Sequence, residues 1–220
     1  MSRVLSLVAL TATTALASTA MAGFANEDAP AWRGDANTMY GLWDTFSQAN
    51  FAPNFAEAGN MGFAGEVYNF SGTAIIAGSG NIYDAQSALN IHNYISLENV
   101  DITDVMINVS TAGSGPDFES VLFQAVSSDG SSQFLDTSDY SMNFQQDIPG
   151  FGSTLNMSWS FDLSGIDSDV TTLAFIIKGT GPHMSLDAIS TDVAFAVVPA
   201  PGALALLGLA GLAGRRRRRH

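Results

Sequence analysis

Short runs of alternating apolar and polar residues, separated by Gly, Ser, Asn and Asp clusters, fill the chain between residues 23 and 196. The clearest run is 155–163 (LNMSWSFDL), in which every second residue is apolar. Because successive side chains of a strand point to opposite faces, this alternation predicts an antiparallel strand with one buried and one solvated face. Helical periodicity is weak in the same region, so the pattern predicts β-structure throughout.

The same pattern predicts further strands along the region, each bounded by residues typical of turns. The predicted strands are 65–70, 73–77, 92–97, 105–110, 120–127, 141–145, 154–163, 171–178 and 183–195. Glycines at 78–80, 113–116 and 128–131 supply the positive-φ positions that hairpins need. With no internal repeat or linker, we predict one all-β domain over 23–196, an antiparallel two-sheet sandwich with jelly-roll-like order.

The first 22 residues have the features of a secretory signal peptide. Arg3 precedes an apolar run over 4–17, and the small residues Ala20 and Ala22 follow it. A positive charge, a short hydrophobic segment and an Ala-x-Ala site predict a signal peptide over 1–22 that is cut after Ala22. The apolar run is too short to span a bilayer comfortably, which disfavours an N-terminal membrane anchor.

The last 24 residues, 197–220, have three parts in a fixed order. A Val198-Pro199-Ala200-Pro201 motif is followed by an uncharged Leu, Ala and Gly segment over 202–214, and then by Arg215, Arg216, Arg217, Arg218 and Arg219. The prolines prevent a strand or helix from continuing. The apolar segment predicts a short transmembrane helix of about 20 Å. The arginines would hold its end in the cytoplasm, which places the domain on the other side.

This tail resembles the PEP-CTERM sorting signal, in which a proline motif, a short apolar helix and an arginine run occur in the same order. The resemblance covers about residues 198–220. It implies recognition by an exosortase, a membrane-embedded, cysteine transpeptidase-like enzyme of Gram-negative bacteria, with processing near Val198–Pro201. The protein would pass through the inner membrane to the cell surface or extracellular matrix. Ala200 stands where the family usually has Glu, which bears on the exosortase subtype and not on the sorting class.

Segments 159–165, 170–178 and 186–190 are similar to the last strands of galactose-binding-like and carbohydrate-binding-module sandwiches. In those proteins the last strand carries an Asp-x-aliphatic pattern, which matches Asp187 and Ile189 here. The resemblance implies a jelly-roll fold more than it implies sugar binding, because one fold supports many functions.

The charge distribution excludes several partners. All 21 acidic residues lie between Glu27 and Asp192, whereas Arg33 and Lys178 are the two basic residues of 23–198. This region therefore has a formal net charge of −19, against −13 for the whole chain. Such a domain repels phosphate backbones and anionic lipid surfaces, so we expect no nucleic-acid partner. The chain has no Cys, which excludes disulfides, thiolate metal sites and cysteine nucleophiles.

We expect no enzyme, because the chain has no G-x-S-x-G elbow, P-loop or G-x-G-x-x-G motif. His92 and His183 each stand alone, which favours a surface or packed histidine over a metal ligand. The carboxylates are numerous enough to leave a glycosidase pair open.

Calcium is the one cofactor for which the sequence offers candidate ligands. Asp162, Asp167 and Asp169 surround a Gly-containing turn, and Asp101 with Asp104 forms a second acidic loop. Calcium prefers several oxygen ligands in flexible geometry, which such loops can offer. Aspartates that only stabilise turns are the simpler interpretation, because no EF-hand register is present.

Aromatic residues gather early in the domain, at Trp32, Tyr40, Trp43 and Phe46. If they were exposed on one sheet, Trp32, Tyr40 and Trp43 could stack on sugar rings. Packing inside the domain is favoured, because exposed aromatic patches are uncommon on monomers. Trp159 alternates with other apolar residues of its strand and is predicted to lie in the core.

These features predict a protein exported by the secretion machinery and sorted by an exosortase to the cell surface or extracellular matrix. Its expected role there is structural or adhesive, within an exopolysaccharide layer. Two alternatives stay open. A carbohydrate-binding module would need an exposed aromatic strip on one sheet face, and a secreted glycan hydrolase would need a cleft with two carboxylates of unlike pKa.

Overall fold

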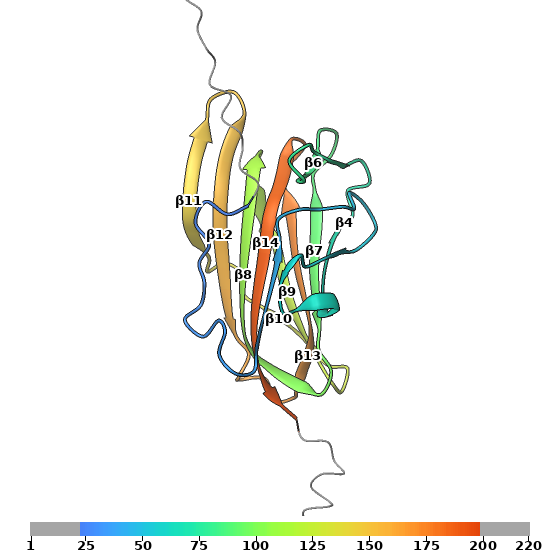
Figure 1. Cartoon of the computed structure of the whole chain (residues 1–220), viewed down its shortest axis with the longest axis vertical. Helices are drawn as coiled ribbons and strands as arrows, with labels where there is room; N and C mark the ends of the chain where they lie inside the picture. The colour runs from blue at the N-terminus through green and yellow to red at the C-terminus, as the bar shows by residue number, and fades with distance from the viewer. Residues whose placement is uncertain (1–22, 199–220) are drawn as a thin grey trace, which may run out of the picture.

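The computed structural model describes residues 23–198, and the two ends of the chain, 1–22 and 199–220, lie outside the described residues. The described part is all-β, as predicted, and consists of two antiparallel sheets that pack face to face (Figure 1). The predicted signal peptide, the proline motif after Val198, the apolar segment and the arginine run all lie outside the described residues.

The first sheet, called sheet A here, has eight strands. Its order is β11 (Ser141–Ile148), β12 (Gly152–Asp162), β8 (Val100–Gly113), β14 (Met184–Val197), β1 (Thr38–Trp43) and β3 (Ala58–Gly59). In addition, β6 (Ile82–Asp84) pairs with β14, and β5 (Ile75–Ile76) pairs with β6. The long strands β8 and β14 pair over almost their whole length, from Val100–Val197 to Gly113–Met184, and form the centre of the sheet.

The second sheet, sheet B, has six strands. Its order is β10 (Ser132–Leu135), β9 (Pro116–Ser127), β13 (Val170–Gly179), β7 (Asn90–Ser96), β4 (Gly65–Asn69) and β2 (Asn54–Phe55). A single 3-10 turn, η1 (Gly62–Ala64), precedes β4. From β7 onward the chain alternates between the sheets, apart from the β9–β10 and β11–β12 hairpins.

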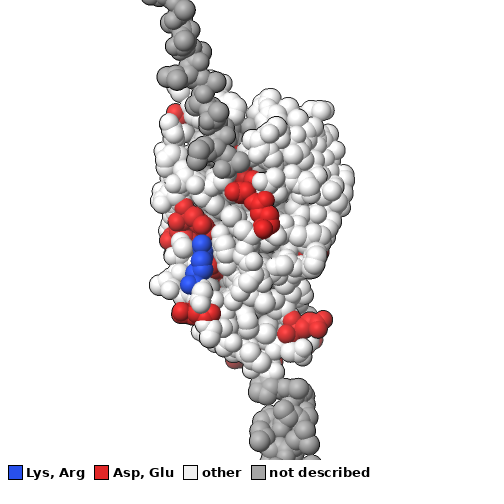
Figure 2. All heavy atoms as spheres, in the orientation of Figure 1, with Lys and Arg blue, Asp and Glu red and all other residues white. Residues whose placement is uncertain are grey.

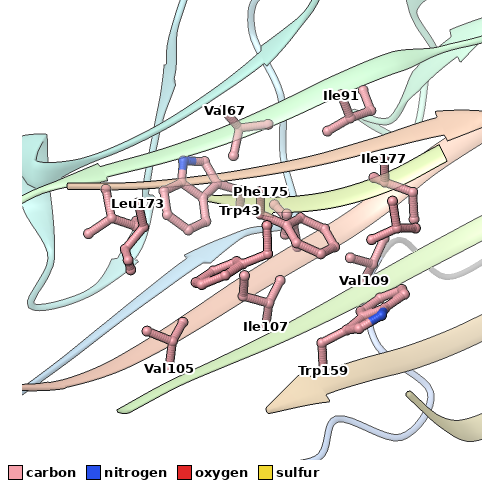
Figure 3. Packing of buried hydrophobic residues seen from close by; sticks show 14 of the residues in the cluster. Trp43, Val67, Ile91, Val105, Ile107, Val109, Trp159, Leu173, Phe175 and Ile177 are labelled. Atoms are coloured by element: carbon pink, nitrogen blue, oxygen red, sulfur yellow. The ribbon is translucent and has the colours of Figure 1, made fainter. Parts of the chain in front are cut away.

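The core lies between the sheets and takes the apolar positions of the alternating strands. Met157, Trp159 and Phe161 of β12 are buried there, as the alternation over 155–163 predicts. Phe161 stacks on Phe123 of sheet B with a ring-centroid distance of 3.8 Å, and Trp159 packs against Phe175 (Figure 3). The predicted placement of Trp159 in the core is confirmed.

The prediction of a solvated second face for this strand holds only at its end, where Ser160 and Asp162 are exposed. Asn156 and Ser158 point away from the core, yet they are 0% and 3% exposed. Residues 23–36, called the N-terminal segment here, run across the outer face of sheet A and cover it (Figure 1). The Asn26 backbone N–H donates to Asn156 Oδ1 at 2.8 Å, and Ser158 Oγ donates to Asp28 Oδ2 at 3.3 Å. Polar side chains are therefore buried because backbone and side chains of this segment satisfy them.

All strands predicted from residue 105 onward are present, several with longer bounds, such as β8 and β9. The predicted strand 73–77 shortens to β5, and the pattern missed β1, β2, β3, β6 and β10. Predicted turn glycines do adopt positive φ at Gly80, Gly113 and Gly130. At Gly113 a Cβ atom would lie 2.0 Å from the His183 carbonyl oxygen, so glycine is required where β8 meets the start of β14.

Candidate functional site

The outer face of sheet B carries a continuous group of aromatic side chains, called the aromatic face here. Tyr68 of β4, His92 and Tyr94 of β7, and Phe70 directly after β4 are only partly covered or exposed. Alternate residues of a strand share a face. Glu66 and Tyr68 therefore both point outward, while Val67 points into the core. The group continues at its edges with three exposed rings, Phe51, Phe55 and Phe63.

The rings of the aromatic face contact one another along and across the strands. Tyr68 and Phe70 are nearly parallel, with an interplanar angle of 8° and centroids 5.6 Å apart. Phe70 meets His92 edge to face at 4.7 Å, and Tyr68 meets Tyr94 at 5.9 Å. These mutual contacts hold the rings in place, so the face is ordered without being covered.

Hydrogen bonds fix the polar atoms of this face. His92 Nε2 lies 3.1 Å from Asn90 Oδ1 and Nδ1 lies 2.7 Å from the Tyr94 hydroxyl, so Nε2 donates and Nδ1 accepts. Burial, with a contribution from the Lys178 charge, lowers the pKa of His92, which favours the neutral ring. Tyr68 donates to Glu66 Oε2 at 3.0 Å at the edge of the group.

The aromatic residues predicted from the sequence lie elsewhere. Trp43 is 0% exposed and donates through Nε1 to the Asn54 carbonyl, and Phe46 is also buried. A fully buried indole has no ring face free for a sugar, so the structure removes Trp43 from the candidate glycan contacts and supports packing for it. Trp32 and Tyr40 are half-buried on the outer face of sheet A, on the opposite side of the sandwich from the aromatic face.

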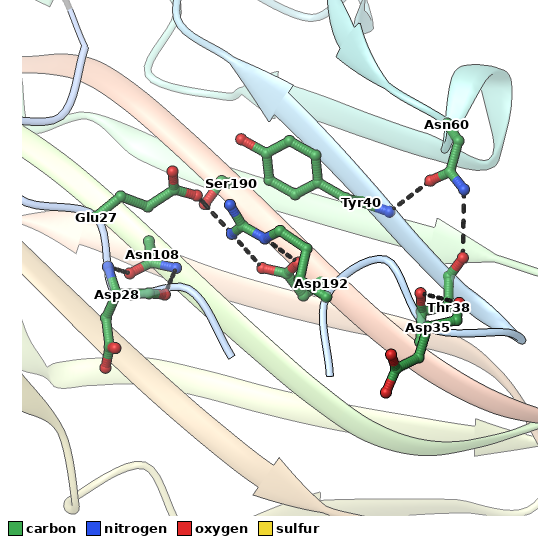
Figure 4. Close-up of polar contacts among 10 residues, drawn as sticks. Glu27, Asp28, Asp35, Thr38, Tyr40, Asn60, Asn108, Ser190 and Asp192 are labelled. Atoms are coloured by element: carbon green, nitrogen blue, oxygen red, sulfur yellow. Dashed lines mark hydrogen bonds and ion pairs between the residues drawn. The ribbon is translucent and has the colours of Figure 1, made fainter. Parts of the chain in front are cut away.

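Tyr40 belongs to an ion-pair network that anchors the N-terminal segment (Figure 4). Arg33 donates two hydrogen bonds of 2.6 Å to the carboxylate of Asp192 and one of 2.6 Å to Glu27, and its guanidinium carbon lies 3.9 Å from the Tyr40 ring centroid. On the face of the molecule seen in Figure 2, the basic atoms are bordered by acidic ones.

The pKa values of this network follow from its burial and its charges. Burial raises the pKa of Asp192, and the Arg33 contacts offset part of that effect. Burial acts to lower the pKa of Arg33, but its hydrogen bonds to Asp192 and Glu27 raise it overall. Burial, with the Glu27 charge, raises the pKa of Tyr40 to about 12. The network therefore keeps Arg33 charged and its carboxylates paired, which is a structural role.

A cavity of about 600 Å³ opens on the outer face of sheet A, next to Ala25 of the N-terminal segment. Its floor includes Ser185 and Asp187 of β14, and its walls come from the β5–β6 turn and the β11–β12 hairpin. Asp187 stands at a β-bulge, where the register of β14 shifts between Leu186 and Ala188. Such a bulge changes the direction of a side chain, and here it places the carboxyl group in the cavity.

The Asp187 carboxyl group is 3% exposed and is held by two donors. Asn81 Nδ2 lies 2.5 Å and Ser185 Oγ 2.8 Å from the same oxygen, Oδ1. Burial raises the pKa of Asp187 to about 6, although both hydrogen bonds lower it in part. Sequence reasoning gave Asp187 no role in a site; its signal was an acidic residue between Leu186 and Ala188 in a predicted strand.

Asp147 also lines this cavity, so the hydrolase alternative can be examined there. The pKa of Asp147 is lowered by hydrogen bonds from Ser153 and Gln145, and that of Asp187 is raised by burial. Neither carboxylate contributes to the pKa shift of the other, whereas two carboxyl groups that share a site do so. The cavity is therefore lined by two carboxylates of unlike pKa, each shifted by its own surroundings, and the hydrolase alternative stays open.

The calcium candidates behave as turn residues. Asp162 Oδ1 accepts from the Ser164 N–H at 2.9 Å, and the hydrogen bonds of Ser164 lower the pKa of Asp162. The prediction of a second acidic loop is wrong, because Asp101 and Asp104 both lie in strand β8. Asp101 nevertheless lies beside the first loop, where its carboxylate accepts from the Val170 N–H at 2.9 Å. Within residues 23–198, no three His, Asp or Glu side chains come close enough to hold a metal ion, and calcium binding at Asp162, Asp167 and Asp169 stays a prediction.

Of the predicted processing residues, only Val198 lies in the described part. Its N–H donates to the Asn99 carbonyl at 3.1 Å, directly after β14 ends at Val197. Ala20, Ala22, Pro199, Ala200, Pro201 and the five arginines lie outside the described residues. Over residues 23–198 there is no helix long and apolar enough to cross a membrane.

Comparison with known proteins adds no family to these observations. No protein-family model matches the chain, and no curated protein matches its sequence significantly. The function must therefore be argued from the aromatic face and the cavity themselves.

Proposed function

We propose that the protein is an exported adhesive component of a polysaccharide layer, and that its aromatic face binds the polysaccharide. The observation that carries this proposal is the uncovered group formed by Tyr68, Phe70, His92 and Tyr94 on sheet B. Exposed aromatic side chains leave apolar surface in contact with water, which is unfavourable unless a ligand covers it. Contiguous exposed patches of this kind are uncommon on monomers and indicate a binding surface. This group meets the criterion set above for a carbohydrate-binding module.

The shape and charge of the face favour a neutral, extended ligand. The rings follow two neighbouring strands, and such a row suits a chain more than a single small molecule. Sugar rings have apolar C–H faces that pack on aromatic rings, and hydroxyl groups that need polar partners at the margin. Glu66, Asn90 and Lys178 lie on the same outer face and offer such partners.

The export and sorting parts of the proposal rest on the sequence of the two ends. The signal peptide over 1–22, the Val198–Pro201 motif, the apolar segment and Arg215–Arg219 support passage through the inner membrane and processing by an exosortase. The alternation of strands between the two sheets from β7 onward supports the jelly-roll-like order that we propose for the domain. We propose binding without catalysis and without a resident cofactor.

The binding proposal is tested with extracellular polysaccharide isolated from the native host. Affinity electrophoresis should show that the protein is retarded by this polysaccharide, and that Tyr68→Ser with Phe70→Ser weakens retardation by about tenfold or more. Phe134→Ser is the matched control, because Phe134 is exposed on β10 at the other edge of sheet B. Equal binding by wild type and double variant, or equal loss in the control, would contradict the proposal.

A second measurement separates binding from catalysis. New reducing ends should not appear when the polysaccharide is incubated with the protein. Their appearance, together with its loss in Asp187→Asn, would show a hydrolase.

Sorting is tested independently by intact mass and terminal peptides of the protein recovered from the envelope and medium of its native host. We expect a chain that begins at Gly23 and ends near Pro199. A chain that still ends in His220 would contradict exosortase processing but would leave glycan binding untouched. Replacing Arg215–Arg219 by Ser should impair retention or processing.

A further inference from the structure

The cavity on sheet A has an unusual polar floor for its size. Asn81 is 5% exposed and points Nδ2 at Asp187, because an amide oxygen in that position would face a carboxylate oxygen. Asn81 Oδ1 is then buried without a hydrogen-bond partner among the described residues. A buried carbonyl oxygen without a partner is destabilising, and native proteins seldom leave one unless a ligand or water satisfies it.

The second oxygen of Asp187 is in a similar position. Both donors at this floor, Asn81 Nδ2 and Ser185 Oγ, bond to Oδ1, and the described residues give Oδ2 no hydrogen bond. The floor thus offers two acceptor oxygens, Asn81 Oδ1 and Asp187 Oδ2, that lack donors. A group that only donates fits it better than a hydroxyl group, whose own lone pairs would need partners.

The charge of the cavity selects the sign of such a group. Asp147 and Asp187 line it, and among its described lining residues there is no Lys, Arg or His to balance them. The rings of Tyr83, Phe144 and Phe151 form part of the walls. Aromatic rings attract cations and also pack against aliphatic carbon, whereas anions gain nothing from such a site.

From these contacts we propose that the cavity binds a small primary amine, with its ammonium group on Asp187 Oδ2 and Asn81 Oδ1 and its aliphatic part against the aromatic walls. An ammonium group has three donors and no acceptor, which matches the floor. The volume of about 600 Å³ lies within the usual range for small-molecule sites. This site is separate from the aromatic face and does not depend on glycan binding.

The test uses n-butylammonium as the probe and protein produced from the full-length coding sequence. Isothermal titration calorimetry should show millimolar binding of butylammonium, and binding weaker by about tenfold or more for 1-butanol and for butyrate. Butanol keeps the shape without the charge, and butyrate reverses the charge. Asp187→Asn should weaken butylammonium binding by about tenfold or more, because it keeps the shape of the side chain and removes the charge.

Asp162→Asn is the matched control variant, since Asp162 is an exposed turn carboxylate outside the cavity, and it should bind as wild type does. The proposal is overturned if butylammonium does not bind in the millimolar range, or if butanol binds as tightly. It is also overturned if both variants weaken binding equally, which would show attraction to the acidic surface alone. A hexose that displaces butylammonium from the wild type would assign the cavity to glycan binding instead.

Discussion

The outer faces of sheets A and B differ in what covers them and in which side chains they carry. On sheet A the outward positions are polar, with Asn108, Asn156 and Ser158 among them, and the N-terminal segment buries them. On sheet B the outward positions of β4 and β7 include the aromatic residues Tyr68, His92 and Tyr94, which are partly open to solvent. Usual expectations for a sandwich would place the polar face in water and cover the aromatic one.

The difference shows that burial alone does not identify a functional surface. Polar groups on sheet A are satisfied by the chain itself: Asn108 Nδ2 donates to the Asp28 carbonyl, and Asp28 N–H donates to Asn108 Oδ1 (Figure 4). This reciprocal pair gives both polar atoms of the Asn108 amide a partner within the chain, which is a structural role. The aromatic face has no such internal cover, so its apolar area is available to a partner.

The largest effect is expected where the cover of sheet A is anchored. Arg33→Ala leaves Asp192, which is 0% exposed, without its cation, and the free energy of unfolding should fall by about 3 kcal/mol. Chemical unfolding measures this loss, and hydrogen exchange should show faster exchange over 23–36. The deficit should shrink as the pH falls, because removing Arg33 raises the pKa of Asp192 further and protonation then removes the unpaired charge.

Lys178→Ala is the matched control for this prediction, because it removes the other basic residue of 23–198 from the uncovered sheet. Its unfolding free energy should change by no more than about 0.5 kcal/mol. Equal losses in the two variants would mean that net charge, and not the anchoring of the N-terminal segment, sets stability.

A smaller effect is expected at the uncovered end of sheet A, where Asp187 lines the cavity. Its pKa of about 6 lies above the ordinary value of a carboxyl group, so the folded state binds the proton more tightly. Stability from this group is therefore full below about pH 4 and is lost as the pH rises through 6, by about 2 kcal/mol between pH 4 and pH 6. Above about pH 7 its contribution no longer changes.

Asp187→Asn should flatten the unfolding free energy across this range, because an amide does not titrate. Urea unfolding at a series of pH values, compared with Asp162→Asn, provides the measurement. Because Asp192 also has a raised pKa, part of the slope should remain. An unchanged slope between pH 4 and 6 in Asp187→Asn would contradict the raised pKa of Asp187.

Nine of the strands and the core around β12 could be predicted from the sequence because alternation is a local property. Met157, Trp159 and Phe161 follow it, and all three are buried. The burial of the outer face of sheet A by the N-terminal segment could not be predicted. This segment has no periodic pattern, and its hydrogen-bond partners are distant in the sequence. Arg33 and Asp192 lie 159 positions apart. The one available signal was that a lone arginine in an acidic domain needs carboxylate partners.

The aromatic face was missed for a related reason. Strands 65–70 and 92–97 were predicted, and alternation within them places Tyr68 with Phe70 and His92 with Tyr94. In 65–70, however, Val67, Tyr68 and Phe70 are all candidates for the core, so the pattern does not say which face is buried. That β4 and β7 are neighbours follows only from the sheet topology. The bulge that directs Asp187 into the cavity likewise has no local signal.

The smallest effect on stability is expected for substitutions on the aromatic face. These substitutions therefore separate the outer faces of sheets A and B most clearly. Tyr68→Ser and Phe70→Ser remove rings that contact mainly each other and their neighbours, so each should lower the unfolding free energy by about 1 kcal/mol or less. The same substitutions should abolish most polysaccharide retardation. Arg33→Ala should lose about three times as much unfolding free energy, yet it should still be retarded by the polysaccharide under conditions in which it is folded. If polysaccharide binding instead follows stability across all three variants, the aromatic face is part of the fold and not the binding surface.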